Sequence, residues 1–130
     1  MAGELILIIE DNEKNRRLVR DVLRFKGYQT VETETAEEGL RVARESHPAL
    51  VLMDIQLPGM DGTAALGELR RDPATRDIPV IAVTASVMPL ERKEILAAGF
   101  DGYQGKPLSV KELLVEVRRL IDRAGATTRE

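Results

Sequence analysis

The amino-acid sequence predicts an α/β fold, a three-layer doubly wound (βα)5 domain with a five-stranded parallel sheet in the order 2-1-3-4-5. Over 130 residues, five short apolar runs alternate with five amphipathic stretches, without a linker or a low-complexity break. Three of the runs are continuously apolar, as strands covered by helices on both faces are. Right-handed crossovers between parallel strands, with one more polar strand at the edge, then give this strand order.

The apolar runs define the expected strands. Those from Leu5 to Ile9, Leu50 to Asp54 and Val80 to Thr84 are the continuously apolar ones. The run from Gly102 to Gly105 is a weaker strand candidate. The run from Gln29 to Thr33 is half polar, which indicates a strand at the edge of the sheet.

Helix signals fill the gaps between these runs. Gly27 stands where the first helix is expected to end. Thr35 and Glu38 fit a capping box, in which a hydroxyl and a later carboxylate satisfy free amide groups of the first turn. Pro89 suits the first turn of the fourth helix.

The last helix has the clearest apolar stripe. Its apolar residues recur at helical spacing: Val110, Leu113, Leu114, Val117, Leu120 and Ile121. Ser109 and Glu112 fit a second capping box at its start. The small and polar tail from Ala124 to Glu130 is expected to be frayed. We therefore expect residues 1–130 to form a single domain with its core at about 5–121.

Composition limits the chemistry that the chain can perform. With 43% hydrophobic residues, its length suits one compact domain. It has no cysteine, which excludes disulfides, thiolate metal sites and a thiol nucleophile. Since His47 is the single histidine, any metal is expected to bind through oxygen, which favours Mg2+, Mn2+ or Ca2+.

Charge and hydropathy also limit the expected partners. A net charge of -3 and four aromatic residues, two Phe and two Tyr, argue against direct binding of nucleic acid. No apolar stretch approaches the roughly 20 residues of a membrane span, and the first residues lack the features of a signal peptide. We expect a soluble cytoplasmic protein without a membrane partner.

Polar residues close the apolar runs. Asp54 ends one run, and Glu10, Asp11, Thr84 and Lys106 fall at the ends of three others. Because the carboxyl ends of parallel strands share one rim of the sheet, we expect these side chains to converge. Three carboxylates, a hydroxyl and an amine on one rim suit a divalent cation and a phosphoryl group.

Four motifs at the strand ends carry a family resemblance. They are Ile9-Glu10-Asp11-Asn12, the segment Leu52–Gly62, Val83-Thr84-Ala85 and Gly105-Lys106-Pro107. Together they resemble the receiver domain of two-component response regulators, which has the CheY-like, flavodoxin-like fold. The resemblance spans residue 5 to about residue 121 and looks closest to stand-alone or hybrid-kinase receivers with a Glu-Asp-Asn motif.

The resemblance implies a role for each rim residue. Asp54 is implied as the phosphoacceptor, a carboxylate nucleophile that takes a phosphoryl group from a phosphohistidine. Asp11 and Asp54 are implied as direct ligands of Mg2+, for which Mn2+ or Ca2+ could substitute. The backbone carbonyl of Gln56 is implied as a further ligand, and Glu10 acts mainly through a water. Lys106 is implied to pair with a phosphoryl oxygen.

Thr84 and Tyr103 are implied as the switch. The Thr84 hydroxyl would move toward the new phosphoryl group, and the ring of Tyr103 would occupy the vacated space. Most of these site residues also have a structural alternative. Asp54 and the acidic pair at Glu10 would cap turns or helices, Lys106 would be a surface lysine, and Tyr103 would only cover the sheet edge.

Two surfaces are candidates for partner binding. A basic stripe marks the first helix: Arg16, Arg17, Arg20 and Arg24. It is either a solvated face or a docking surface for a sensor histidine kinase or histidine phosphotransfer protein. The face of the fourth helix, fifth strand and fifth helix, with Met88, Leu90 and Tyr103 nearby, suits a downstream effector or a phosphorylation-dependent homodimer.

The expected function is a phosphorylation-dependent signalling switch of a two-component phosphorelay. Such a protein is not an enzyme, because it catalyses only its own phosphoryl transfer and slow autodephosphorylation. The alternative is a receiver-like binding module that works without phosphorylation, but such domains usually lose the acidic pair, the aspartate or the lysine. A flavin-binding protein is disfavoured by the acidic residues after the first strand, and an aspartate-based phosphatase by Gln56. The chain is expected to be either a complete small regulator or a fragment of a longer protein.

Overall fold

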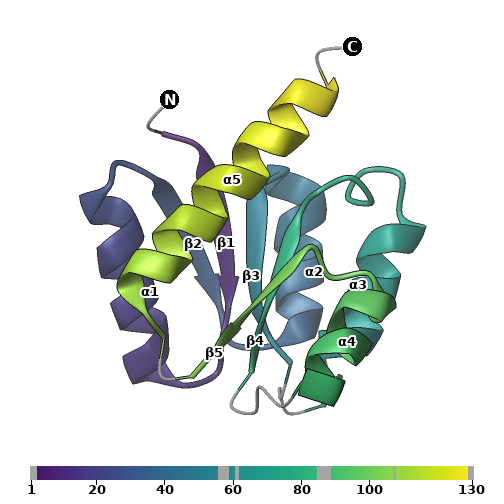
Figure 1. Cartoon of the computed structure of the whole chain (residues 1–130). Coiled ribbons are helices and arrows are strands. Elements are labelled where there is room, and N and C mark those ends of the chain that lie inside the picture. The colour runs from purple at the N-terminus through teal and green to yellow at the C-terminus, as the bar shows by residue number, and fades with distance from the viewer. Residues whose placement is uncertain (1–2, 56–58, 61, 85–88, 107, 129–130) are drawn as a thin grey trace.

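The computed structural model describes residues 3–55, 59–60, 62–84, 89–106 and 108–128, without the side chains of 89–92 and 124–128. This part of the chain contains five strands and five helices, which alternate strictly (Figure 1). The strands are β1 (Leu5–Ile9), β2 (Gln29–Thr33), β3 (Leu50–Asp54), β4 (Val80–Thr84) and β5 (Gly102–Gly105). The helices are α1 (Glu13–Phe25), α2 (Ala36–Ser46), α3 (Gly62–Arg71), α4 (Pro89–Ala98) and α5 (Val110–Thr128).

The strands form one parallel sheet in the order β2-β1-β3-β4-β5. This confirms the predicted order and places the half-polar strand β2 at an edge. The strand bounds also agree with the five predicted runs. All the strands point the same way, so their carboxyl ends lie along one rim of the sheet.

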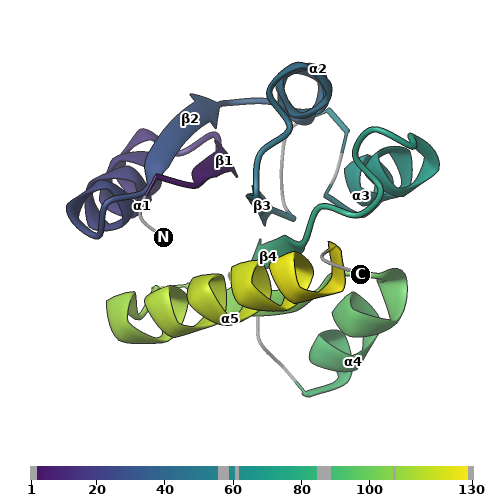
Figure 2. The same cartoon turned by 90° about the horizontal axis from the view of Figure 1, so that it is seen from above.

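Two hydrophobic cores lie on opposite faces of the sheet. Alternate side chains of β1 serve both: Ile6 and Ile8 join the core beneath α1 and α5, whereas Leu7 and Ile9 join the core beneath α2 and α3. Figure 2 shows these helix pairs on the two sides of the sheet, with α4 beside the β5 edge. Because both faces are covered, an uninterrupted apolar run is what a central strand requires.

Helix caps form at the predicted positions. The Thr35 hydroxyl accepts a hydrogen bond from the Glu38 amide at 3.2 Å, and the Ser109 hydroxyl accepts one from the Glu112 amide at 3.4 Å. Asn12 caps α1, where its side chain accepts from the amide of a residue in the first turn at 3.0 Å. These caps fix the start of helices that follow the carboxyl ends of the strands.

α5 continues to Thr128, so the backbone of residues 124–128, which belong to the tail expected to be frayed, is helical. A helix that is already formed and packed on the sheet extends at little cost, since each added residue contributes one backbone hydrogen bond. Figure 1 shows the last turns of α5 projecting past the end of the sheet. Among the helices of the described residues, none is long and apolar enough to span a bilayer.

Candidate functional site

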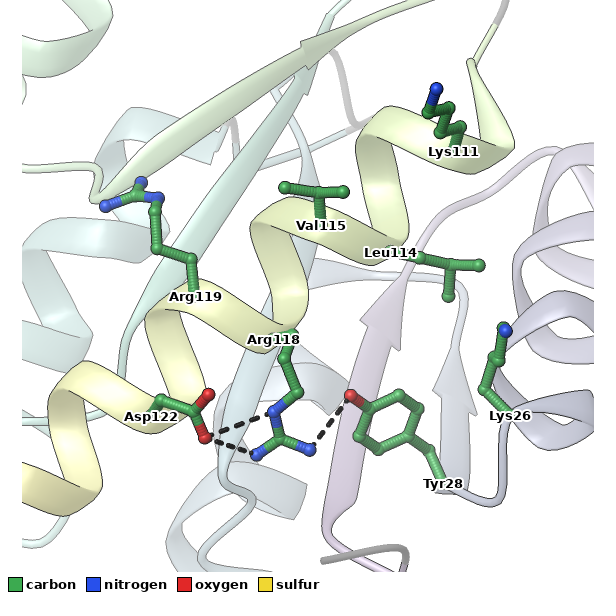
Figure 3. A pocket seen from close by; sticks show the side chains of 8 residues that line it. All are labelled: Lys26, Tyr28, Lys111, Leu114, Val115, Arg118, Arg119 and Asp122. Atoms are coloured by element: carbon green, nitrogen blue, oxygen red, sulfur yellow. Dashed lines mark hydrogen bonds and ion pairs between the residues drawn. The ribbon is translucent and has the colours of Figure 1, made fainter.

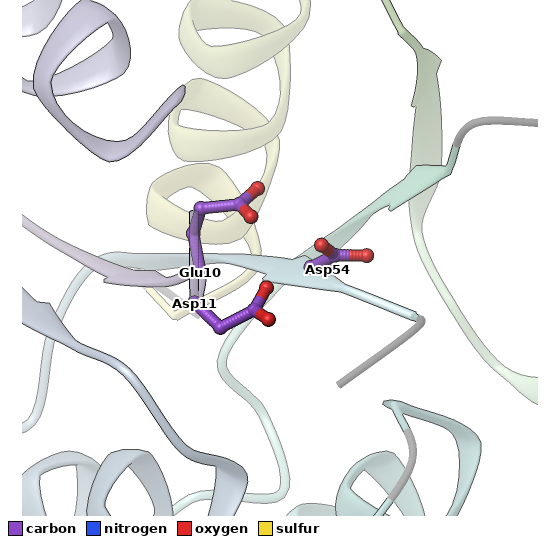
Figure 4. Close-up of side chains that lie close together, drawn as sticks. All are labelled: Glu10, Asp11 and Asp54. Atoms are coloured by element: carbon purple, nitrogen blue, oxygen red, sulfur yellow. The ribbon is translucent and has the colours of Figure 1, made fainter. Parts of the chain in front are cut away.

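Three carboxylates from neighbouring strands meet at the carboxyl rim of the sheet. Glu10 and Asp11 directly follow β1, and Asp54 is the last residue of the adjacent strand β3. One oxygen from each lies within 4.8 Å of the other two (Figure 4). Glu10 and Asp54 are only 5% and 3% exposed, whereas Asp11 is open to solvent. The structure thus brings together the acidic residues that the strand ends predicted.

Lys106 supplies the positive charge of this cluster. Its Nζ donates a hydrogen bond to Oδ2 of Asp54 at 2.9 Å and lies 3.3 Å from Oε1 of Glu10. Its backbone amide donates to the carbonyl of Thr84 at 2.8 Å, which fixes the chain after β5 against β4. Burial lowers the pKa of Lys106, but its hydrogen bond to Asp54 and the nearby negative charges outweigh this effect and raise the pKa.

Glu10 is the carboxylate whose protonation the site changes most clearly. Burial raises its pKa from 4.5 to about 7. The hydrogen bond that its Oε2 accepts from the Asn12 amide at 3.1 Å lowers the pKa, and the charge of Asp54 raises it again. At neutral pH the isolated protein therefore carries Glu10 partly protonated.

The donor set fits a hard divalent cation. Within the described residues, all the side-chain ligands gathered here are carboxylate oxygens, the type that Mg2+ and Ca2+ prefer. A cation among them would relieve the repulsion between carboxylates that one lysine only partly offsets. Gln56, which was expected to add its backbone carbonyl, lies outside the described residues.

Thr84 and Tyr103 lie on the same face of the sheet. Thr84 ends β4 opposite Gly105, while Tyr103 pairs with Ala82, two residues earlier on β4. Thr84 is buried, and Tyr103 is partly buried against the core beneath α2 and α3. This register allows the two side chains to respond to one another, although it equally suits a ring that only covers the sheet edge.

Arg16 contributes to the site through a contact with the backbone of Glu10, and the sequence did not predict this role. Its Nη1 donates to the backbone carbonyl of Glu10 at 2.9 Å, and its Nε lies 3.3 Å from Oε1 of Glu32 on β2. In the sequence it appeared only as one member of the basic stripe. The one available signal was its place one turn into the helix that follows the acidic pair.

The rest of the basic stripe also makes internal contacts. Arg20 lies 3.5 Å from the second oxygen of Glu32, and Arg24 donates to the Thr30 hydroxyl at 2.8 Å. Arg17 instead pairs along the helix with Glu13 at 3.7 Å. Much of the stripe therefore ties α1 to β2, which gives it a structural role whether or not it also docks a partner.

Of the other expected surface residues, Met88 lies outside the described residues, and the side chain of Leu90 is not described.

A separate groove of about 710 Å3 lies where the end of α1 and the start of β2 approach α5 (Figure 3). Its lining residues are Lys26, Tyr28, Lys111, Leu114, Val115, Arg118, Arg119 and Asp122. It shares no residue with the carboxylate cluster, and it was not predicted. Arg118 crosses it, donating to the Tyr28 hydroxyl at 3.2 Å and to Asp122 at 2.9 Å.

Comparison with known proteins agrees with this geometry. Residues 6–118 match the family described as the response regulator receiver domain. The polar-differentiation response regulator DivK of Brucella ovis is 42% identical over 113 residues, which cover 87% of this chain and 92% of that protein.

Solved structures are similar over nearly the whole chain. The receiver domain of a sensor histidine kinase from Pseudomonas aeruginosa PAO1, with a magnesium ion coordinated in its active-site cleft, is 34% identical with a TM-score of 0.85. That likeness covers 93% of this chain and 99% of the other. The signal receiver domain of a histidine kinase from Syntrophus aciditrophicus is 32% identical with a TM-score of 0.84, covering 92% and 91% of the two chains.

Proposed function

Because the chain belongs to the response regulator receiver domain family, we propose that it accepts a phosphoryl group on Asp54 in a reaction that requires Mg2+. The observation that carries this proposal is the contact between Asp54 and Lys106 at 2.9 Å, inside a cluster of three carboxylates. A buried aspartate at a strand end would serve equally well as a cap. A lysine and two further acids gathered around it support a phosphoryl site instead.

Asp54 acts as the nucleophile in this reaction. One of its carboxylate oxygens forms a bond to phosphorus while the phosphorus–nitrogen bond of a phosphohistidine on the donor breaks. The electron pair of that bond stays on the imidazole nitrogen, and the product on this chain is an acyl phosphate. Since both Asp54 and the incoming group are negative, the reaction needs positive charge close to the oxygens that transfer.

Two sources of positive charge meet this need. Bound Mg2+, for which Mn2+ or Ca2+ could substitute, offsets negative charge on the phosphoryl oxygens. Asp11 and Asp54 would hold it directly with the backbone carbonyl of Gln56, and Glu10 would hold it through a water. Lys106 already pairs with Asp54, so its ammonium is placed to transfer that hydrogen bond to a phosphoryl oxygen.

The acyl phosphate would then bias the switch. The Thr84 hydroxyl would donate a hydrogen bond to the phosphoryl group, and the ring of Tyr103 would turn into the space that Thr84 leaves. The two side chains lie on the same face of the sheet, which supports a coupling between their movements. Phosphorylation in this way shifts the balance between two conformations that the chain already samples. The chain catalyses its own phosphoryl transfer and slow autodephosphorylation, and no other reaction.

Receiver domains act through kinases and effectors. For this chain the proposed donor is a sensor histidine kinase or a histidine phosphotransfer protein, in the cytoplasm. The face formed by α4, β5 and α5 would bind an effector or, after phosphorylation, a second copy of the chain. Leu96 on α4 and Val110 on α5 support this, because both are exposed apolar side chains. We also propose that residues 1–130 form one receiver domain.

Labelling with a small phosphodonor tests the central claim. With acetyl phosphate and Mg2+, intact-mass measurement is expected to show one added phosphoryl group on the wild-type chain and none on Asp54→Asn. Asp21→Asn, which changes an exposed carboxylate on α1, is the matched control and is expected to label like the wild type. Equal labelling of Asp54→Asn would exclude Asp54 as the acceptor. No Mg2+-dependent labelling of the wild type would favour a phosphorylation-independent binding module.

A further inference from the structure

Arg16 links the acidic site to the edge of the sheet. Its guanidinium contacts the backbone carbonyl of Glu10 through Nη1 at 2.9 Å and the carboxylate of Glu32 through Nε at 3.3 Å. The side chain is only 15% exposed, so these contacts are shielded from water. A guanidinium presents several donors in a rigid plane, and it can therefore satisfy two acceptors at a fixed separation.

The contact with Glu10 bears on the geometry of the carboxylate cluster. Glu10 is held on its other side as well, because its amide donates to the carbonyl of Thr33 at 3.1 Å. The Glu10 carbonyl belongs to the peptide unit that leads into Asp11. Fixing this carbonyl therefore fixes the direction in which the backbone presents Asp11 to Asp54.

We infer that Arg16 is a positioning residue for the cation site, which holds the Glu10–Asp11 peptide in the orientation that cation binding requires. The inference rests on the proposed function, since it assumes that the three carboxylates bind Mg2+. Within the described residues, Arg16 makes no hydrogen bond or ion pair with a carboxylate of the cluster, so it acts through the backbone.

Electrostatics alone predicts the opposite effect. A positive charge beside the site repels a divalent cation, so removing Arg16 would strengthen Mg2+ binding if charge were decisive. The carboxylate of Glu32 offsets the positive charge of Arg16, and Arg20 also pairs with this carboxylate at 3.5 Å. With the charge partly neutralised, loss of backbone orientation is expected to dominate. The sign of the change in affinity therefore separates the two explanations.

Arg17 provides a matched control on the same helix. It carries the same charge one residue later, is 64% exposed, and pairs with Glu13 at 3.7 Å. Within the described residues, Arg17 makes no hydrogen bond or ion pair with Glu10. Arg16→Met and Arg17→Met change the net charge equally, so a difference between them reports the shielded contacts of Arg16 with the Glu10 carbonyl and with Glu32.

The test is a Mg2+ titration of the full chain, followed through backbone amide NMR shifts at constant pH and ionic strength, with a melting curve for each variant. Arg16→Met is expected to raise the Kd for Mg2+ by about tenfold, the lower end of what outer partners of metal ligands contribute. Arg17→Met is expected to change it by less than about twofold, as for other exposed charges. Arg16→Lys keeps the charge but cannot reproduce the planar fork, so it is expected to weaken binding too.

The possible outcomes are distinct. An unchanged or lower Kd in folded Arg16→Met would overturn the inference and leave the proposed function intact. If Arg16→Met does not fold, the Arg16→Lys variant provides the test. A Kd of Arg16→Lys for Mg2+ equal to that of the wild type would overturn the inference. A wild-type chain that binds no Mg2+ would overturn the proposed cation site and this inference with it.

Discussion

Glu10 is the residue whose charge depends most visibly on its surroundings. It stands between a lysine that favours its ionised form and a buried aspartate that disfavours it. Its ordinary pKa is 4.5, and in the folded chain burial raises the pKa to about 7. Between these two values the folded state binds more protons than the unfolded state.

This difference predicts how stability changes with pH. As the pH rises from about 4.5 to about 7, the contribution of Glu10 to the free energy of unfolding falls, by at most about 3 kcal/mol. Urea unfolding of the wild type and Glu10→Gln, without divalent cations, is expected to show the wild type losing stability relative to the variant across this window. Saturating Mg2+ should reduce the loss, because it favours the ionised form. Parallel pH profiles for the two proteins would contradict the raised pKa.

The residues that form the site differ in how well sequence predicts them. Asp54, Glu10 and Lys106 were predictable because each follows an apolar run, and parallel strands bring such positions to one rim. Arg16 was not predictable in the same way. A stripe of arginines shows that a helix has a basic side, but not which guanidinium turns back to a backbone carbonyl.

At the scale of elements, α3 begins against the backbone that follows β3. The amide of Gly62 donates to the carbonyl of Ile55 at 2.9 Å. A Cβ on Gly62 would lie 2.7 Å from the Cα of Ile55 and 3.1 Å from the carbonyl oxygen of Asp54. Backbone atoms cannot rotate away as a side chain can, so a methyl group here would force the strand end and the helix apart.

Two glycine substitutions in the same helix test this close approach. Gly62→Ala is expected to lower the free energy of unfolding by about 1–3 kcal/mol through overpacking. Gly67→Ala, where an added Cβ has no neighbour within 4 Å, is expected to raise it by about 0.4–1 kcal/mol through reduced chain entropy. Urea unfolding measures both changes. A Gly62→Ala variant as stable as Gly67→Ala would show that the helix can shift freely.

The strands and helices were largely predictable from the pattern of apolar and polar residues. Strands covered on both faces have continuous apolar runs, and the predicted bounds agree with β1, β3 and β4. The end of α5 was not readable, because residues 124–128 have the small and polar composition of a tail. Their helical state comes from extension of a helix fixed elsewhere, which local composition does not record.

At the scale of the whole molecule, Arg118 joins the two ends of the fold. From α5 it reaches Glu4, just before β1, at 2.9 Å across a sequence separation of 114 residues. It also donates to the Tyr28 hydroxyl at 3.2 Å, and its guanidinium lies 5.8 Å from the centre of that ring. Hydrophobic periodicity predicted that α5 packs on the sheet, but it carries no information about this contact.

Loss of this connection is expected to destabilise the whole domain. Arg118→Met removes hydrogen bonds to two carboxylates and a hydroxyl, and should lower the free energy of unfolding by about 1–3 kcal/mol. Arg119→Met is the control, because Arg119 is 48% exposed and, within the part of the chain that the structure describes, forms an ion pair only with Glu116. It should cost less than about 1 kcal/mol. Equal losses in urea unfolding would show that the long-range link contributes nothing beyond a surface ion pair.

The strand order also divides the site between interior strands and an edge strand. Asp54 ends β3 and the acidic pair follows β1, and both strands have hydrogen-bonded neighbours on each side, whereas Lys106 follows the edge strand β5. Border strands open locally at lower free energy than strands in the interior of a sheet. Transient detachment of β5 would carry the ammonium away and leave the carboxylates assembled. If the proposed site takes up a divalent cation, that cation would therefore replace the ammonium of Lys106 without separating the strands that hold the carboxylates together.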